Sequence, residues 1–515
     1  MKNFIQKYEA NVTGVLSGFD RLVFRGTLRA LAVVGGAMDY LWRMGVLLKD
    51  FGAHVEQMTE RLKAASLDEA RRLSRPIVYL ASSATSKEET ARQIARKDGI
   101  REGLIGVLTA VEPCRSYMIY RDRSKKELVL KRAIRKGLQL YHYWMDKDFG
   151  LMHGRISTWF PFPIQIGLNG REWLGRRMDA KGIRYTRREN SFPWIEDMGE
   201  AQRMMDQMQR LTWPEVLRDI GRRLNPAHEA MFDRYRIDYY WVVHQSEWAS
   251  DVMFEKRSTV ERLYPLLTRG AMEAFSAKEV MRFFGKKPWG RFAGEVVSDH
   301  RRWEEGVRVK HQVKGNSVKS YDKGSILRAE TTINAPREFQ SYHCSERDPK
   351  GQKKWLPMRQ GVADLYRRAE VSQAANERYL DALAALSTDR PLREWVEPVC
   401  RVVRWKGRRV RAIRPWSEPD RSLLAVVNDG AWCLNGFRQR DLMSHLYPKV
   451  TSDPVERRRI SGRLTRYIRL LRAHGLIRKV SGTYRYHVTD TGRQVLTAIL
   501  QYQHLSLQQI TDKAA

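Results

Sequence analysis

Runs of alternating or continuous apolar residues dominate the first 185 residues of the chain, a pattern typical of β-strands. Residues 52–75 instead have helical periodicity, and Ser86 with Glu89 forms a candidate capping box for a helix ending near residue 98. We therefore expect an α/β N-terminal domain over residues 1–197, with an at least partly antiparallel sheet. The predicted strands lie within residues 11–29, 77–83, 103–122, 138–146 and 151–170.

The pattern becomes helical between residues 198 and 290, where Met, Trp and Tyr are frequent. On such a helix, His244, Glu247 and Asp251 of HQSEWASDVMF would share one face, because their spacings are three and four. That face is either a metal-binding arrangement or an ordinary polar face. Residues 291–387 are then expected to complete the body with a β-hairpin over 306–334 and a helix near 359–387.

The last part of the chain begins with a basic connector over residues 388–425, which contains RVVRWKGRRVRAIRP with Arg408 and Arg409. Residues 426–515 follow with a short helix over 438–448, a long helix over 455–477 and a hairpin with Ser481-Gly482 at its tip. This order resembles the MarR-like winged helices over about 60 residues. The expected fold is therefore α+β: a mixed or largely antiparallel sheet body with a helical insertion, and a C-terminal winged helix-turn-helix domain.

The long helix has two distinct faces. Apolar residues recur at helical spacing on one face, and Arg459, Arg463 and Arg466 lie on the other. In the winged-helix fold such an arginine face can enter a major groove, with Arg485 contributing from the wing. The alternative is a winged helix that contacts protein, with these arginines as solvated charge. The apolar residues are Ile460, Leu464, Ile468 and Leu471.

Composition favours a polyanionic partner. The chain has 93 Lys and Arg against 59 Asp and Glu, which gives a net charge of +34. Nucleic acid is the commonest polyanion, so we expect DNA as the partner, with RNA as the alternative. No long apolar stretch predicts a membrane span, and the four cysteines form no CxxC pair, so a cytoplasmic protein is expected. The sequence does not determine the oligomeric state, and a homodimer is one of the alternatives.

The stretch NSVKSYDKGSILRAETTIN (316–334) predicts a hairpin with charged and hydroxyl-bearing side chains on one face. A two-residue loop at Lys323-Gly324 would pair Tyr321 with Ile326 and Lys319 with Arg328. Alternation then puts Lys319, Tyr321, Arg328 and Glu330 on one face, with Thr332 beside them. Val318, Leu327, Ala329 and Ile333 would point to the core.

That face has the composition of a phosphodiester-cleaving site. Tyr321 could attack phosphate, Lys and Arg could stabilise the added negative charge, and Glu330 could hold a divalent metal. Locally, YxK, a turn and RxE resemble plasmid rolling-circle replication initiators, which cut one DNA strand with a tyrosine. The His-hydrophobic-His pair of many such enzymes is absent, with Arg155 where a second histidine would follow His153. The alternative is plain cross-strand ion pairing.

Further carboxylates occur within or after apolar, strand-like runs. Asp20 lies in GFDRLVFRG, Glu112 follows GVLTAV, and Asp146 follows LQLYHYWM. Nucleases and transposases of the RNase H type place metal-binding carboxylates in this way. Turn formation and a salt bridge to a neighbouring arginine are the alternatives. We predict a Mg²⁺ or Mn²⁺ site from Asp20, Glu112, Asp251 and Glu330.

Several longer stretches are shared landmarks of a large family of bacterial proteins that the chain resembles over most of its length. These are FDRLVFRGTLR, LNGREWL, SYDKGSILRAETTIN and RYIRLLRAHGLI. The resemblance implies a bacterial source and mobile-element character, and it brings no activity with it. The leading expectation is a metal-dependent strand-cleaving nuclease, transposase or replication initiator. The alternative is a non-catalytic DNA-binding regulator or a protein that binds structured RNA, including one that the RNA guides.

Overall fold

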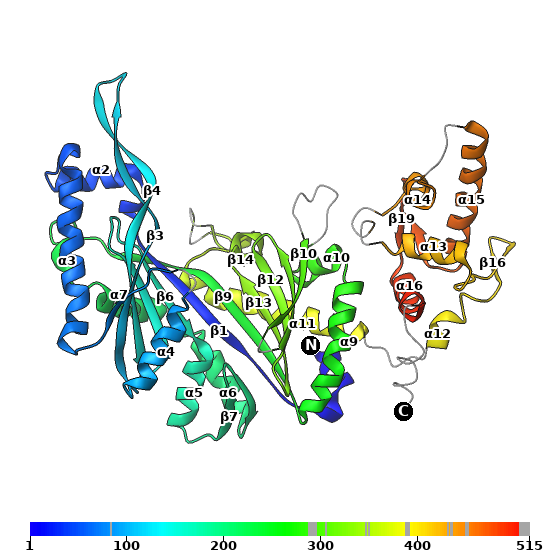
Figure 1. Ribbon diagram of the computed structural model, residues 1–515, viewed down its shortest axis with the longest axis horizontal. Helices are drawn as coiled ribbons and strands as arrows, with labels where there is room; N and C mark the ends of the chain where they lie inside the picture. Colours follow the sequence, from blue (N-terminus) through cyan, green and yellow to red (C-terminus); the bar gives the residue numbers. More distant parts are fainter. Residues whose placement is uncertain are drawn as a thin grey trace.

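The computed structural model describes residues 1–82, 85–286, 296–303, 306–345, 348, 351–386, 392–429, 432, 436–448 and 453–503. Within these residues the fold is α+β and is built on one eleven-stranded sheet (Figure 1). All neighbouring strands are antiparallel except β2 and β3, so the expected mixed, largely antiparallel sheet is confirmed. In spatial order the strands are β10 (Val296–Trp303), β11 (Gly306–Val313), β12 (Asn316–Asp322), β13 (Ile326–Ile333), β9 (Tyr239–Phe254), β1 (Val12–Leu28), β6 (Ile164–Asn169), β5 (Gly150–Ser157), β4 (Glu127–Asp146), β3 (Gly103–Asp122) and β2 (Ile77–Tyr79).

Two long strands, β1 and β9, form the middle of the sheet and pair along almost their whole length. The helix expected over residues 244–254 is therefore wrong, because these residues lie in β9. Much of β9 is buried on both faces, so its sequence lacks the alternation that marks a half-exposed strand. The spacing of His244, Glu247 and Asp251 fits a helix only by coincidence, and pairing with β1 and β13 decides the structure.

Helices cover both faces of the sheet. On one face of the β9–β13 half, apolar side chains of α9, α10, α11 and α1 pack against Val318, Leu327, Ala329 and Ile333, which confirms the predicted core side of the hairpin. The other half of the sheet packs against the largest apolar cluster. The helices of the body are α1 (Lys2–Lys7), α2 (Val34–Arg43), α3 (Phe51–Arg72), α4 (Lys87–Lys97), α5 (Gly170–Ala180), α6 (Met198–Met208), α7 (Trp213–Leu224), α8 (His228–Met231), α9 (Arg257–Ala274), α10 (Ala277–Phe283) and α11 (Leu365–Leu386).

Local signals in the N-terminal part are mostly confirmed. Ser86 caps α4, since its Oγ accepts from the backbone N of Glu89 at 3.2 Å. One strand, β3, covers the whole expected range 103–122 and continues through Pro113. The strand expected within 77–83 is shorter, covering Ile77–Tyr79, and it lies partly exposed at the edge of the sheet, whereas its apolar run is typical of a buried strand. Two further hairpins are β7 (Tyr185–Arg188) with β8 (Ser191–Ile195), and β14 (Gln340–His343) with β15 (Lys354–Pro357).

The C-terminal part has its own apolar core. The predicted apolar face is present, with Leu464, Ile468 and Leu471 buried, and Gly475 ends the long helix with a φ of 70°. Val410 of the expected connector joins the same core. The domain boundaries stay predictions. The elements are α12 (Leu392–Val396), β16 (Val403–Trp405), β17 (Arg408–Val410), α13 (Glu418–Val427), α14 (Gln439–Leu446), α15 (Pro454–Ala473), β18 (Ile477–Lys479), β19 (Tyr486–Val488) and α16 (Asp490–Gln503).

Two further findings concern membrane spans and cysteines. Among the described residues, none of the helices combines the length and the apolar character needed to cross a membrane. Cys114, Cys344 and Cys400 are free thiols, and Cys433 lies outside the described residues.

Two buried histidines are expected to make the fold acid-sensitive. His142 and His311 are buried, and burial lowers the pKa of each from 6.5 to about 4. Between these values the unfolded chain binds protons that the folded chain does not, so the free energy of unfolding falls as the pH falls. For each histidine, the loss in the free energy of unfolding approaches about 1.4 kcal/mol for each pKa unit by which the folded and unfolded values differ. Thermal melting midpoints measured from pH 7.5 to pH 4.5 should decrease below pH 6.5. The decrease should be shallower for His311→Gln, and an unchanged slope would contradict this account.

Candidate metal centre

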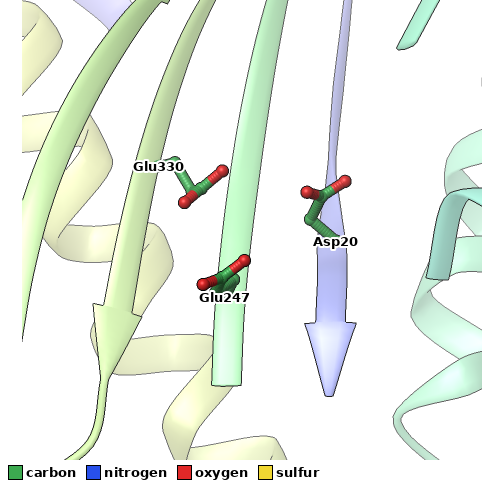
Figure 2. A group of neighbouring side chains, drawn as sticks. All are labelled: Asp20, Glu247 and Glu330. Carbon is green, nitrogen blue, oxygen red and sulfur yellow. The ribbon is translucent and has the colours of Figure 1, made fainter. Parts of the chain in front are cut away.

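Three carboxylates from three neighbouring strands meet on one face of the sheet. Asp20 comes from β1, Glu247 from β9 and Glu330 from β13, and each places a carboxylate oxygen within 4.8 Å of the others. Figure 2 shows the three side chains turned toward one another over the central strands. Asp20 and Glu330 are buried and Glu247 is half-buried. Carboxylate oxygens at this spacing could hold a hard divalent cation.

A β-bulge aims Asp20 at this cluster. Phe19 is paired with Trp248 and Arg21 with Glu247, so β1 has one more residue than β9 over this step. The extra residue is Asp20, which turns toward the same face as Arg21. Bulges re-aim side chains in this way and are frequent next to active sites.

The LNGREWL stretch supports the bulge from the next strand. β6 ends at Asn169, whose Oδ1 accepts from the backbone N of Arg171 at 2.8 Å and so caps α5. Gly170 lies so close to β1 that a Cβ atom would be 1.9 Å from the carbonyl oxygen of Phe19. A residue other than glycine would push the helix away from the strand. Arg171 then reaches the ion pairs beneath the cluster.

Two buried arginines and two aspartates form a network beside the carboxylates. Arg328 binds Asp251 through two contacts, Nε–Oδ1 at 2.6 Å and Nη2–Oδ2 at 2.9 Å, and its Nη1 is 3.2 Å from Asp20 Oδ1. Arg171 Nη2 is 3.0 Å from Asp251 Oδ2. Burial opposes ionisation of Asp251, but Arg328 and Arg171 outweigh burial and hold its pKa below the ordinary value. Both oxygens of Asp251 are thus used by arginines.

This network corrects two predictions. Asp251 was expected to bind metal, yet it is the counter-ion of Arg328 and Arg171 and lies outside the carboxylate cluster. Arg328 was expected to contact nucleic acid, but its side chain is only 1% exposed and is held by Asp251, Asp20 and the carbonyl oxygen of Asn190. The alternation of the sequence predicts on which face of the sheet a side chain lies. It does not predict whether another layer of the chain packs over that face. Here α5 and the β7–β8 hairpin provide that layer.

Asp20 belongs to both the network and the cluster. Its Oδ1 accepts from Asn190 Nδ2 at 2.6 Å and lies near Arg328 Nη1. Burial raises the pKa of Asp20, Arg328 lowers it, and Glu330 raises it further, so the net direction is upward. A bound cation would favour the ionised form of this carboxyl group.

The predicted hairpin register is wrong by two residues. Tyr321 pairs with Arg328 and Lys319 with Glu330, around a longer loop closed by Lys323 N donating to Ile326 O at 3.0 Å. Because side chains alternate with a period of two, this shift keeps all four side chains on the predicted face. Lys319 Nζ is 2.8 Å from Glu330 Oε1 and 4.0 Å from Glu247 Oε1. The carboxylates that pair with Lys319 are therefore the same carboxylates that could bind a metal.

The pKa of Glu247 is raised by burial and by the negative charges close to it. Burial and the nearby carboxylate of Glu330 raise its pKa to about 6, and Lys319 offsets only part of this. Gln245 Nε2 donates to Glu247 Oε1 at 2.7 Å. Carboxylates held close together repel, and a divalent cation between them removes that cost.

An open cavity reaches the cluster from the side of β6. It has a volume of about 570 Å³ and is lined by Asp20 and Glu247 at one end and by α4 at the other. Four basic side chains, Arg21, Arg92, Arg187 and Lys323, line it together with six carboxylates. Three of the four basic side chains are paired with lining glutamates: Arg92 with Glu88, Arg187 with Glu172 and Lys323 with Glu189. The lining is therefore mixed in charge, and a ligand with phosphate groups would meet cations that are mostly paired.

Other predicted site residues lie elsewhere. Glu112 is on β3, four strands away from β1, and the prediction that it joins this centre is wrong. Its carboxylate accepts from Tyr141 Oη at 2.7 Å and pairs with Lys87 and Arg155, because long-range pairing of β3 with β4 sets its neighbours. Asp146 accepts from the backbone N of Asp148 at 2.9 Å, as in an ordinary turn.

Tyr321 lies near the cluster, but its ionisation is disfavoured. Burial and the charge of Glu330 raise the pKa of Tyr321 to about 12. The hydroxyl therefore keeps its proton at neutral pH unless a neighbouring group takes it. Its role as a nucleophile stays a prediction.

Predicted nucleic-acid contacts fall into two groups. Lys319 and Lys323 lie at or beside the cavity, and Lys323 Nζ is 3.9 Å from Glu189 Oε2. The remaining residues lie in the C-terminal part, and their role stays a prediction. Arg408, Arg409, Arg459, Arg463 and Arg466 are exposed there, and Arg485 Nη1 donates to the carbonyl oxygen of Gly436 at 3.3 Å.

Sequence reasoning left three contributors out of the predicted centre: Glu247, Arg171 and Asn190. Glu247 was recognised as a potential ligand, but on a helix with the wrong neighbours. Arg171 lies in LNGREWL, where a polar residue directly after a strand was the available signal. Asn190 lies in the turn between β7 and β8, and nothing in its local sequence links it to Asp20.

Comparison with known proteins found no match among protein-family models, curated proteins or solved structures. Inference about function therefore depends on the geometry of the chain itself.

Metal binding should depend on the three clustered carboxylates and not on Glu112. Titration calorimetry with MnCl₂ at pH 7.5 should show binding that Glu247→Gln and Glu330→Gln weaken by at least about 10-fold. Glu112→Gln removes a carboxylate from the same sheet outside the cluster, and it should leave the affinity unchanged. Equal weakening by all three substitutions would place the metal elsewhere.

Asp251→Asn should destabilise the fold rather than remove a metal ligand. It leaves the buried Arg328 and Arg171 with Asp20 as their one remaining carboxylate in the network, so we expect a loss of about 3–5 kcal/mol in the free energy of unfolding. Urea unfolding followed by tryptophan fluorescence would measure it. A loss below about 1 kcal/mol together with abolished Mn²⁺ binding would support the ligand role instead.

Proposed function

We propose that the chain is a divalent-metal-dependent enzyme that cleaves phosphodiester bonds in nucleic acid. The observation that carries the proposal is the convergence of Asp20, Glu247 and Glu330 from three distant segments beside an open cavity lined by both acidic and basic side chains. Buried carboxylates are costly, and Lys319 and Arg328 offset only part of the repulsion among these three, so a bound cation would stabilise their charged form. Mg²⁺ or Mn²⁺ suits an all-oxygen ligand set.

The residues around the cluster fit distinct roles in such a reaction. A bound cation would polarise a phosphate oxygen or lower the pKa of an attacking water. Burial opposes the charge on Lys319, but Glu330 outweighs it and raises the pKa of Lys319, so this residue remains a cation. It is therefore suited to stabilising the developing negative charge and not to removing a proton. Gln245 and Asn190 hold Glu247 and Asp20 in place.

A nucleic acid is favoured over a small phosphate ester by charge. The net charge of +34 extends far beyond the cavity. A field of this size attracts a long polyanion and adds little to recognition of a single phosphate. We take a role in DNA mobility or replication as the working hypothesis.

The C-terminal part is proposed to be a winged helix-turn-helix that binds the same nucleic acid. The order α14, α15, β18, β19 supports this proposal, as do the arginines on the exposed face of α15. Arg459, Arg463 and Arg466 recur there at helical spacing, and such a helix fits a major groove. A regulator without catalytic activity is the rival, and it would use this part alone.

Cleavage assays separate these alternatives. Labelled single- and double-stranded DNA should be cut with Mn²⁺ or Mg²⁺ and remain intact in EDTA. Asp20→Asn and Glu330→Gln should each lower the rate by about 100-fold or more, because each removes charge that positions the cation. Circular dichroism of each variant shows whether the fold is kept. An intact substrate under every metal condition would favour the non-catalytic regulator.

The role of Tyr321 can be read in the same assay. If water attacks, Tyr321→Phe should keep the rate within about 10-fold of the unaltered chain, and no covalent DNA adduct should form. A DNA-linked protein band that Tyr321→Phe abolishes would instead establish tyrosine attack.

A further inference from the structure

The strands β3 and β4 continue beyond the sheet as a two-stranded arm, which Figure 1 shows projecting past its neighbours. β5 pairs with β4 only over Gln139–Asp146, and β2 pairs with β3 only over Val107–Thr109. Residues 113–136 therefore pair only with each other in the described sheet. These residues are defined here as the arm.

The arm is strongly basic. It contains nine lysines and arginines against two acidic residues, and all nine basic side chains are exposed. Its open face also carries Met118, Tyr120 and Lys131, and Lys131 Nζ lies 5.5 Å from the centre of the Tyr120 ring. The basic residues are Arg115, Arg121, Arg123, Lys125, Lys126, Lys131, Arg132, Arg135 and Lys136.

Contacts at both ends order the arm. At its base, Tyr117 Oη donates to the carbonyl oxygen of Leu31 at 2.8 Å, and Arg132 Nη2 donates to that of Ala32 at 2.7 Å. At its tip, Asp122 Oδ1 accepts from the backbone N of Ser124 at 3.0 Å, which fixes a tight turn. The charges are thus presented on a pre-ordered ribbon, which lowers the entropic cost of binding.

We propose that the arm enters the major groove of a DNA duplex. A two-stranded β-ribbon fits a groove about 12 Å wide, and side chains on its two edges can contact the phosphates. Duplex RNA has a deep, narrow major groove that such a ribbon cannot enter. The arm would therefore select B-form DNA over duplex RNA. Provided that the proposed function holds, duplex B-form DNA is then the substrate class of the chain.

A row of arginines connects the arm to the carboxylate cluster. Arg25 of β1 and Arg155 of β5 both pair with Gln165 of β6, so they flank it on one row of the sheet. Burial lowers the pKa of Arg25, and the nearby charges of Arg115 and Arg155 lower it further. Along β1, this row is four residues from Arg21, about 14 Å toward the arm. A duplex held by the arm could therefore follow these cations toward the cavity.

Binding measured in EDTA tests the arm separately from cleavage. Fluorescence anisotropy would compare a 20-base-pair DNA duplex with an RNA duplex of the same sequence, over a range of KCl concentrations. The full chain would be compared with a variant carrying Arg121→Gln, Arg123→Gln, Lys125→Gln and Lys126→Gln. For this variant the DNA affinity should fall by about 10-fold or more. The slope of log affinity against log salt concentration should become shallower by up to about 3.6, since each of four phosphate contacts contributes about 0.9. The preference for DNA over RNA should narrow.

Two further variants keep the test decisive. The control removes four exposed basic residues near or on α3, through Lys49→Gln, Arg61→Gln, Arg71→Gln and Arg72→Gln. A second variant replaces residues 120–129 by Asn-Gly, which leaves the paired Ile119 and Leu130 beside a two-residue turn. It should lose DNA binding as the first variant does. A loss no larger than that of the control, or an equal loss for both duplexes, would overturn the proposal. Cleavage could still be intact in that case.

Discussion

The buried ion pairs among Arg328, Arg171, Asp251 and Asp20 are the interaction on which the rest of the structure depends. Removing four charges from water costs several kcal/mol for each ion, and only close pairing offsets this cost. The partners come from β13, α5, β9 and β1, so four distant segments must meet in one register. A slip of one residue in any of these strands would leave a buried charge without its partner, since it turns every side chain to the other face.

The carboxylate cluster inherits its geometry from this network. Asp20 contacts Arg328 through Oδ1 and approaches Glu247 and Glu330 on the open side, so it links the buried pairs to the cavity. The positive charges of Arg328 and Lys319 lie close enough to limit the repulsion among the carboxylates. They do not remove it, because the pKa of Glu247 still rises to about 6. The remaining imbalance is what a cation would relieve.

Sequence reasoning succeeded where a two-residue period was visible and failed where long-range pairing decides. The hairpin alternation placed Lys319, Tyr321 and Glu330 on one face correctly, even though the loop is longer than expected. The strand β9 gave no such signal, because it is buried on both faces. The position of Asp20 depends on a bulge, and the separation of Glu112 depends on the strand order. Neither the bulge nor the strand order can be predicted from a local sequence pattern.

The distribution of positive charge separates the two halves of the sheet. Around the cluster, cations are paired: Arg328 and Arg171 with Asp251, and Lys319 with Glu330. Toward the arm the balance changes, since Arg25, Arg115 and Arg155 lie close enough to repel and Glu112 offsets only part of that charge. Repulsion among these arginines lowers the stability of the fold. A bound ligand that carries negative charge would offset this repulsion. The centre would then hold a cation and its neighbourhood a polyanion, which is the division of charge that cleavage of a phosphodiester requires.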